Sequence, residues 1–160
     1  MPGKLVKLSE LKKIRAGWKQ AGRKMVFTNG CFDLIHPGHI RCLARAKSLG
    51  DYLVIGLNSD ASVKRIKEKG RPILPERERA EILCAFWFVD YVVLFKEDTP
   101  EKLIRALEPE VLVKGADWPT RKIVGADLVL KKGGKVRQID FVKGKSTSKI
   151  IAEIVRRFGN

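Results

Sequence analysis

The two histidines of this 160-residue chain lie three residues apart, in the stretch Gly-Cys-Phe-Asp-Leu-Ile-His-Pro-Gly-His that covers residues 30–39. An apolar run precedes this stretch and predicts a buried strand, whereas the proline favours the first turn of a helix. Unpaired N–H groups and the dipole of a helix N-terminus attract anions, and glycine lets a phosphate approach the backbone closely. Imidazoles placed there can donate hydrogen bonds to phosphate oxygens. We therefore predict a phosphate site at this turn, with His36 and His39 as candidate hydrogen-bond donors, and this suggests nucleotide chemistry.

Two other interpretations of the histidine pair stay open from this stretch alone. The histidines could ligate zinc, but a structural zinc site needs four ligands and a catalytic one needs three. Cys31, Cys42 and Cys84 show no paired Cys-x-x-Cys spacing, so no metal held by protein ligands is predicted. Either histidine could also make an ordinary local hydrogen bond at the helix cap.

Short apolar runs alternate with helical patterns from residue 25 onward, which predicts an α/β domain. The expected strands cover residues 25–28, 52–57, 91–95, 111–114 and 135–139, and the expected helices cover 38–49, 61–68, 76–86, 100–107 and 147–158. We predict a single doubly wound, Rossmann-like parallel sheet with helices on both faces. Its ligand crevice should lie at the carboxyl ends of the strands where the winding reverses. Neither GxGxxG nor GxxxxGK[ST] is present, so the phosphate site must come from elsewhere, and the His-x-Gly-His segment is the best-placed alternative.

The chain is expected to have two parts, an N-terminal helical leader over residues 1–24 and the main domain over residues 25–160. Leu8, Leu11, Ile14 and Trp18 recur at helical spacing in the leader. Ser9 is its expected N-cap, and Gly22 its expected end.

The composition predicts a soluble, cytoplasmic protein. Hydrophobic residues make up 44% and charged residues 32%, and no apolar run approaches the roughly 20 residues of a membrane span. No secretory signal and no disulfide framework are visible. The net charge of +15 could serve a nucleic acid, phosphorylated small molecules or thermal adaptation. Because the basic residues are spread along the chain and Asn and Gln are few, we favour a thermophile and expect no nucleic-acid partner. A basic nucleic-acid-binding module remains the alternative from another class.

Two segments carry a family resemblance. Residues 30–39 resemble the GxFDxxHxGH signature of the cytidylyltransferase-like nucleotidyltransferases, and Ser146-Thr147-Ser148-Lys149-Ile150 resembles that family's second signature. Residues 58–65, 71–73 and 113–117 are similar to the heptose 1-phosphate adenylyltransferase domain, which in many bacteria is fused behind a heptose kinase. This chain looks like a stand-alone version of that domain.

The resemblance implies adenylyl transfer from ATP to D-glycero-β-D-manno-heptose 1-phosphate, giving ADP-heptose and pyrophosphate for the inner core of lipopolysaccharide. Mg²⁺ bound through the nucleotide phosphates is the implied cofactor, and a homodimer the implied assembly. The alternative within the family is cytidylyl transfer to glycerol 3-phosphate or a related small phosphate. The base, the anomeric configuration of the sugar and the oligomeric state do not follow from the residues themselves.

The resemblance also implies the site residues, with His36 and His39 as the catalytic pair that donates to phosphate oxygens. The nucleotide would lie against Thr28, Asn29, Gly30, Cys31, Phe32, Asp33, Gly38, Ser146, Thr147 and Ser148. Substrate phosphates or the sugar would contact Lys64, Lys67, Arg71, Arg79, Lys114, Gly115, Asp117, Trp118 and Lys149. For Asp33, fixing the turn and orienting a histidine are both open. One of the three hydroxyls at 146–148 is expected to be a plain helix cap.

Overall fold

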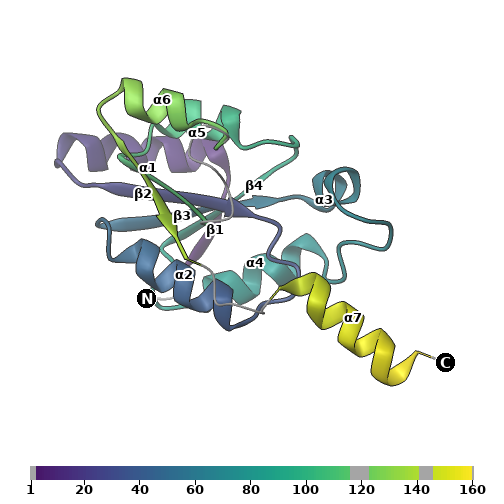
Figure 1. Ribbon diagram of the computed structural model, residues 1–160. Helices are drawn as coiled ribbons and strands as arrows, with labels where there is room; N and C mark the ends of the chain where they lie inside the picture. Colours follow the sequence, from purple (N-terminus) through teal and green to yellow (C-terminus); the bar gives the residue numbers. More distant parts are fainter. Residues whose placement is uncertain (1–2, 116–122, 141–145, 160) are drawn as a thin grey trace.

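A six-stranded parallel sheet forms the centre of the computed structural model, which describes residues 3–115, 123–140 and 146–159 (Figure 1). Its strand order is β1-β4-β3-β2-β5-β6, and every neighbouring pair is parallel. The strands are β1 (Lys4–Val6), β2 (Met25–Gly30), β3 (Tyr52–Asn58), β4 (Tyr91–Phe95), β5 (Val111–Gly115) and β6 (Lys135–Ile139). The predicted parallel α/β sheet is confirmed.

Helices cover both faces of this sheet. They are α1 (Leu8–Gln20), α2 (Pro37–Lys47), α3 (Asp60–Ile66), α4 (Glu76–Cys84), α5 (Glu101–Leu107), α6 (Ala126–Lys131) and α7 (Thr147–Phe158). Helices α1, α5 and α6 lie over one face, α2 and α4 lie over the other, and α7 projects away from the body (Figure 1). Alternating strand residues feed two cores, so Phe27 packs toward the α1 side while its neighbour Val26 packs toward the α2 side.

The winding of the sheet reverses at β2. From β2 the chain adds β3 and β4 on one side and then returns to place β5 and β6 on the other side. A crevice therefore opens at the carboxyl ends of β2 and β5, where Gly30 and Gly115 end their strands. The His36–His39 segment starts α2 directly beyond this point.

Two elements were not predicted. Strand β1 has only three residues, too few to show an alternating pattern, and pairs with β4 in the register Lys4↔Tyr91. Helix α6 spans six residues behind Gly125, whose φ of 82° is one that glycine adopts readily. The expected leader helix is present, but its N-cap is Lys7 and not Ser9. Because β1 joins the sheet and α1 packs in its core, residues 4–20 belong to the same folded body as the sheet.

Candidate active site

A cavity of ≈ 810 Å³ lies at the carboxyl ends of β2, β3 and β5, between the N-termini of α2 and α7. This volume falls in the range of roughly 300–1,000 Å³ that small-molecule sites occupy. The predicted residues that line it are Thr28, Asn29, Gly30, Cys31, Phe32, Asp33, His36, His39, Lys67, Arg71, Lys114, Gly115, Ser146, Thr147, Ser148 and Lys149. Segments more than a hundred residues apart thus meet at one site.

The two imidazoles stack on one another at the start of α2. Their ring centroids are 3.8 Å apart, with 21° between the planes. His36 is the N-cap residue and is 6% exposed, while His39 is partly buried. Burial, and secondarily the neighbouring His36, lowers the pKa of His39 to about 4. A neutral His39 at physiological pH retains one ring N–H to donate, and among the described residues its buried Nδ1 has no hydrogen-bond partner.

The turn between β2 and α2 fixes the ring of His39. Phe32 adopts a φ of 46°, an uncommon backbone conformation for a residue with a bulky side chain. This conformation folds the Phe32 ring over Gly30, where an added Cβ would lie 3.0 Å from the Phe32 Cε2 atom. The same ring contacts that of His39, with 5.2 Å between the ring centroids. Gly30 therefore makes room for the aromatic ring that positions the histidine.

The N-terminus of α7 is the second anion-binding element. Ser146 is the cap, because its hydroxyl accepts the N–H of Lys149 at 3.2 Å. Thr147 donates its hydroxyl to the carbonyl of Leu34 at 3.2 Å and so ties α7 to the turn that carries the histidines. The first turns of α2 and α7 contain no acidic residue. Both helix dipoles consequently present their positive ends to the same cavity.

The cavity wall is cationic. Lys67, Arg71, Lys114 and Lys149 line it and outnumber the two carboxylates among its described lining residues, Asp33 and Asp98. Lys114 donates to the backbone carbonyl of Asn29 at 3.3 Å, which places its ammonium group beside the end of β2. An anionic ligand would gain from this field.

The cavity cysteines do not supply a nucleophile. Burial raises the pKa of the Cys31 thiol, although the nearby cations Lys67, Arg79 and Arg71 oppose that effect. Burial likewise raises the pKa of Cys42, and Lys114 opposes it. Both thiols are therefore protonated at neutral pH and poorly nucleophilic. The cavity suits direct transfer to a ligand oxygen better than covalent catalysis.

Some predicted residues lie elsewhere. Lys64 is exposed on α3, and Gly38 is buried inside α2; neither lines the cavity. Arg79 was expected to face phosphates, but its side chain is 0% exposed and bonds protein groups instead. Asp117 and Trp118 lie outside the described residues.

Asp33 holds the backbone of a neighbouring segment in place. Among its described hydrogen bonds, none goes to a histidine. Its carboxylate accepts the N–H groups of Ile73 at 2.7 Å and Leu74 at 3.0 Å, together with the guanidinium of Arg71. The interpretation of Asp33 as a turn-fixing acceptor is therefore the one that the structure supports.

Nine further described residues, which were not predicted, complete the cavity wall. The additional lining residues are Cys42, Leu43, Asn58, Ile66, Asp98, Thr99, Pro100, Ile123 and Val124. Asn58 could have been found, because it is a polar residue at the end of a strand that is otherwise buried. The others come from loops and helix faces that meet only in the fold.

The described residues provide no protein cage for a metal. No group of three or more His, Cys, Asp or Glu side chains in this part of the chain could hold an ion. Mg²⁺ commonly binds through substrate phosphates and one or two carboxylates, which requires no such group. None of the helices among the described residues combines the length and the apolarity that a membrane span requires.

The doubly wound sheet, the His-x-Gly-His turn and the second helix N-terminus define the class of protein. Residues 27–158 match the model of the cytidylyltransferase-like family, and the chain belongs to that family.

Two relatives share more than half of their residues with this chain over the aligned stretches. The chain is 53% identical over 156 residues to the bifunctional protein HldE of Geobacter metallireducens, covering 98% of this chain and 32% of that protein. It is 57% identical over 136 residues to the bifunctional protein HldE of Campylobacter jejuni subsp. jejuni serotype O:6, covering 85% of this chain and 29% of that protein. The chain thus spans about a third of the length of these relatives.

Solved structures agree with the fold. A lipopolysaccharide core biosynthesis protein from Thermoplasma volcanium superimposes with a TM-score of 0.62 at 28% identity, covering 78% of this chain and 100% of that one. A pantoate–β-alanine ligase from Francisella tularensis, complexed with an ATP ligand and β-alanine, gives a TM-score of 0.60 at 15% identity, covering 99% and 82%. The second likeness shows the fold alone.

Proposed function

We propose that the chain transfers the adenylyl group of ATP to D-glycero-β-D-manno-heptose 1-phosphate, giving ADP-heptose and pyrophosphate for the inner core of lipopolysaccharide. The observation that carries the proposal is the convergence of two helix N-termini on one cationic cavity, with His36 and His39 on α2 and Thr147 on α7. The two HldE relatives and the T. volcanium protein support the choice of reaction by their sequence similarity and names.

The proposed chemistry matches what the residues offer. A phosphate oxygen of the sugar phosphate attacks the α-phosphorus of ATP, and the bond to the β-phosphate breaks as pyrophosphate leaves. The attacking oxygen is already anionic, so no strong general base is needed. Alignment and hydrogen-bond donors for the developing charge are what the protein must supply.

His36 and His39 are the proposed donors to phosphate oxygens in the transition state. Each such donor is worth on the order of 3 kcal/mol, or about a hundredfold in rate. The α7 N-terminus would hold the β- and γ-phosphates, and the Thr147–Leu34 hydrogen bond would keep the two helix starts in register. Mg²⁺ carried by the triphosphate would neutralise part of its charge.

Mass spectrometry of the products from a panel of nucleoside triphosphates and sugar phosphates tests the assignment. The proposal expects ADP-heptose and pyrophosphate from ATP and heptose 1-phosphate. A CDP product from CTP and glycerol 3-phosphate would replace it with the cytidylyl alternative. Binding of DNA or RNA that falls steeply with salt and ignores His36→Ala would favour a nucleic-acid module.

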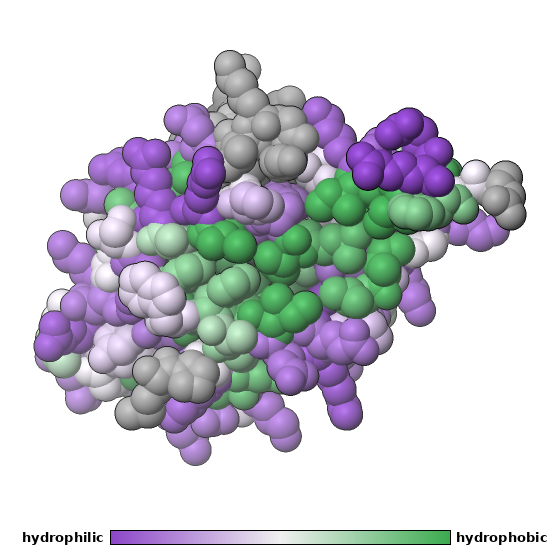
Figure 2. Space-filling view, turned by 90° about the horizontal axis from the view of Figure 1, so that it is seen from below, coloured by the Kyte–Doolittle hydropathy of each residue, from purple (hydrophilic) through white to green (hydrophobic). Residues whose placement is uncertain are grey.

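We also propose that two copies of the chain assemble through the face that carries α4 and α7. In helix α7 no described residue is buried, and Ile154, Val155 and Phe158 are 49%, 61% and 78% exposed. Figure 2 shows a broad apolar area on this face. Exposed Glu78 and Glu81 on α4 complement the basic end of α7, so a two-fold axis would pair unlike charges.

Light scattering after size exclusion tests this assembly. The wild-type chain should have the mass of a dimer, and Phe158→Asp should shift it to the mass of a monomer. Leu130→Asp is the matched control that should leave the dimer intact, because Leu130 is 53% exposed on α6, over the opposite face of the sheet. A monomeric wild type would refute the assembly without touching the reaction.

Two coarser expectations complete the proposal. The enzyme would act in the cytoplasm, where ATP is present. The high Lys, Arg and Glu content would reflect thermal adaptation, in keeping with the shared pairing of Lys19 and Lys132 with Glu108. A thermal melt measures this second expectation directly.

A further inference from the structure

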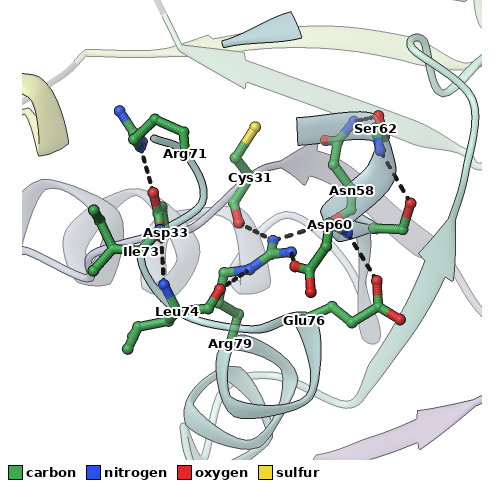
Figure 3. A network of polar contacts seen from close by, with 11 residues as sticks. Cys31, Asp33, Asn58, Asp60, Ser62, Arg71, Ile73, Leu74, Glu76 and Arg79 are labelled. Carbon is green, nitrogen blue, oxygen red and sulfur yellow. Dashed lines mark hydrogen bonds and ion pairs between the residues drawn. The ribbon is translucent and has the colours of Figure 1, made fainter. Parts of the chain in front are cut away.

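A buried carboxylate ties the connection between α3 and α4 (residues 67–75) to the turn that carries the histidines (Figure 3). The Asp33 side chain is 0% exposed. Its Oδ1 accepts two backbone N–H groups, from Ile73 at 2.7 Å and Leu74 at 3.0 Å. Its Oδ2 accepts from Nε of Arg71. The two oxygens thus have separate duties, one toward the backbone and one toward a single side chain.

Arg79 holds the same connection from its other side. Its Nε donates to the carbonyl of Leu74 at 3.0 Å, and its Nη1 donates to the carbonyls of Cys31 and of Asn58, the latter at 2.9 Å. Its Nη2 pairs with Asp60 at 2.7 Å. Figure 3 shows this guanidinium surrounded by groups from three segments. The backbone of the connection is therefore anchored independently of the Asp33–Arg71 pair.

The contact with Oδ2 of Asp33 fixes the position of the Arg71 side chain. This side chain is 8% exposed and lines the cavity. Since Nε is taken by Asp33, the two amino groups of the guanidinium remain for other partners. The carboxylate of Glu68 lies 3.6 Å from Nη1, but the Glu68 side chain is 69% exposed. An exposed carboxylate at that distance is a weak partner.

We propose that Asp33 is a positioning residue that presents the amino groups of Arg71 to a phosphate of the bound substrates, and that Glu68 is a counter-ion displaced when that phosphate binds. This inference rests on the proposed function. A guanidinium suits the task because it offers five donors in a fixed fork and can bond a carboxylate and a phosphate at once. A lysine has one ammonium group and would have to divide it between the two.

A purely structural role for Asp33 would require fewer contacts than its carboxylate makes. To fix the backbone, Asp33 needs only Oδ1, and a neutral asparagine oxygen accepts the same two N–H groups. Among the described contacts, the second oxygen bonds Arg71 alone. Burying this charged pair costs desolvation free energy. A contact between Arg71 and a phosphate in the cavity would give the buried pair a function.

Steady-state kinetics of five single variants and one double variant test the proposal, with pyrophosphate release as the assay and thermal unfolding as the check on folding. Arg71→Met and Arg71→Lys should each raise the KM of a phosphate-bearing substrate by about tenfold to a hundredfold, because a charge-assisted contact is lost. Arg71→Lys should melt near the wild-type temperature. Asp33→Asn should raise the same KM but add little when combined with Arg71→Met. Arg77→Met, which removes an exposed arginine on α4, is the control that should leave KM unchanged.

Several results would overturn the proposal. One is additivity of Asp33→Asn and Arg71→Met, and another is a lowered melting temperature with unchanged KM. If Asp33→Asn does not fold, the Arg71→Lys variant alone tests the proposal. A wild-type KM for Arg71→Lys would then refute the idea that one guanidinium bonds Asp33 and a phosphate at once. Glu68→Gln should leave KM equal or lower; a clear rise would refute the displaced counter-ion. A wild-type enzyme that releases no pyrophosphate from any substrate pair would instead refute the proposed function.

Discussion

Lowering the pH should destabilise this protein through His39 in a window where carboxylates contribute little. Burial beside His36 lowers the pKa of His39 from 6.5 to about 4. The unfolded chain therefore binds a proton between these values while the folded chain does not. Stability from this group is fully present above the unfolded pKa and is lost as the pH falls toward the folded pKa.

The magnitude follows from the two pKa values. Linkage gives a loss of about 2 kcal/mol in the free energy of unfolding between roughly pH 7 and pH 5. Carboxylates with a lowered pKa act in a more acidic window. Hydrogen bonds from Lys132 and Lys19, for example, lower the pKa of Glu108 to about 2. Glu108 therefore loses its contribution to stability only below its unfolded pKa of 4.5. The His39 effect is thus separable by pH.

Urea unfolding followed by tryptophan fluorescence measures it. Trp18 is 8% exposed and its ring stacks on Tyr52 at 4.0 Å, so its emission should report unfolding of the core. Wild-type stability should fall between pH 7 and pH 5, and His39→Gln should flatten this dependence. Equal pH dependence in the two proteins would refute the assignment of a depressed pKa to His39.

Substitutions at three further positions probe the packing and the positioning of the site. Arg79→Met should cost about 3–5 kcal/mol of unfolding free energy, because it leaves a buried polar cluster without its central cation, and Arg79→Lys should cost less; urea denaturation measures both. Gly56→Ala should cost about 1–3 kcal/mol, since an added Cβ would lie 2.8 Å from Cζ of Phe27, and a thermal melt would show it. Thr147→Val removes a 3.2 Å hydrogen bond and should raise the KM for ATP by about threefold to tenfold with little change in melting temperature.

The sequence predicted the architecture well because its signals are local. The strands at residues 91–95 and 135–139 and the helix at 147–158 match their predicted bounds. The same local signals could not reveal β1, whose three residues form a strand only because β4 offers an edge. Long-range pairing decided that element.

The candidate site was predictable where a strand end and a helix start coincide in the sequence, as at His36 and His39. The position of Arg79 could not be predicted from such a local pattern. Its sequence context suggests a surface helix, yet carbonyls of Cys31 and Asn58, more than 20 positions away, draw it into the interior. Which cations face the cavity and which are buried depends on such contacts, and no local pattern encodes them.

The central claim is that His36 and His39 stabilise charge on the phosphates during adenylyl transfer. Single-turnover rates with ATP and the sugar phosphate, measured for the wild type, His36→Ala and His39→Ala, test it most directly. The claim predicts a loss of about a hundredfold or more in the rate of each variant, with thermal unfolding showing an intact fold. Wild-type rates in both folded variants would contradict it.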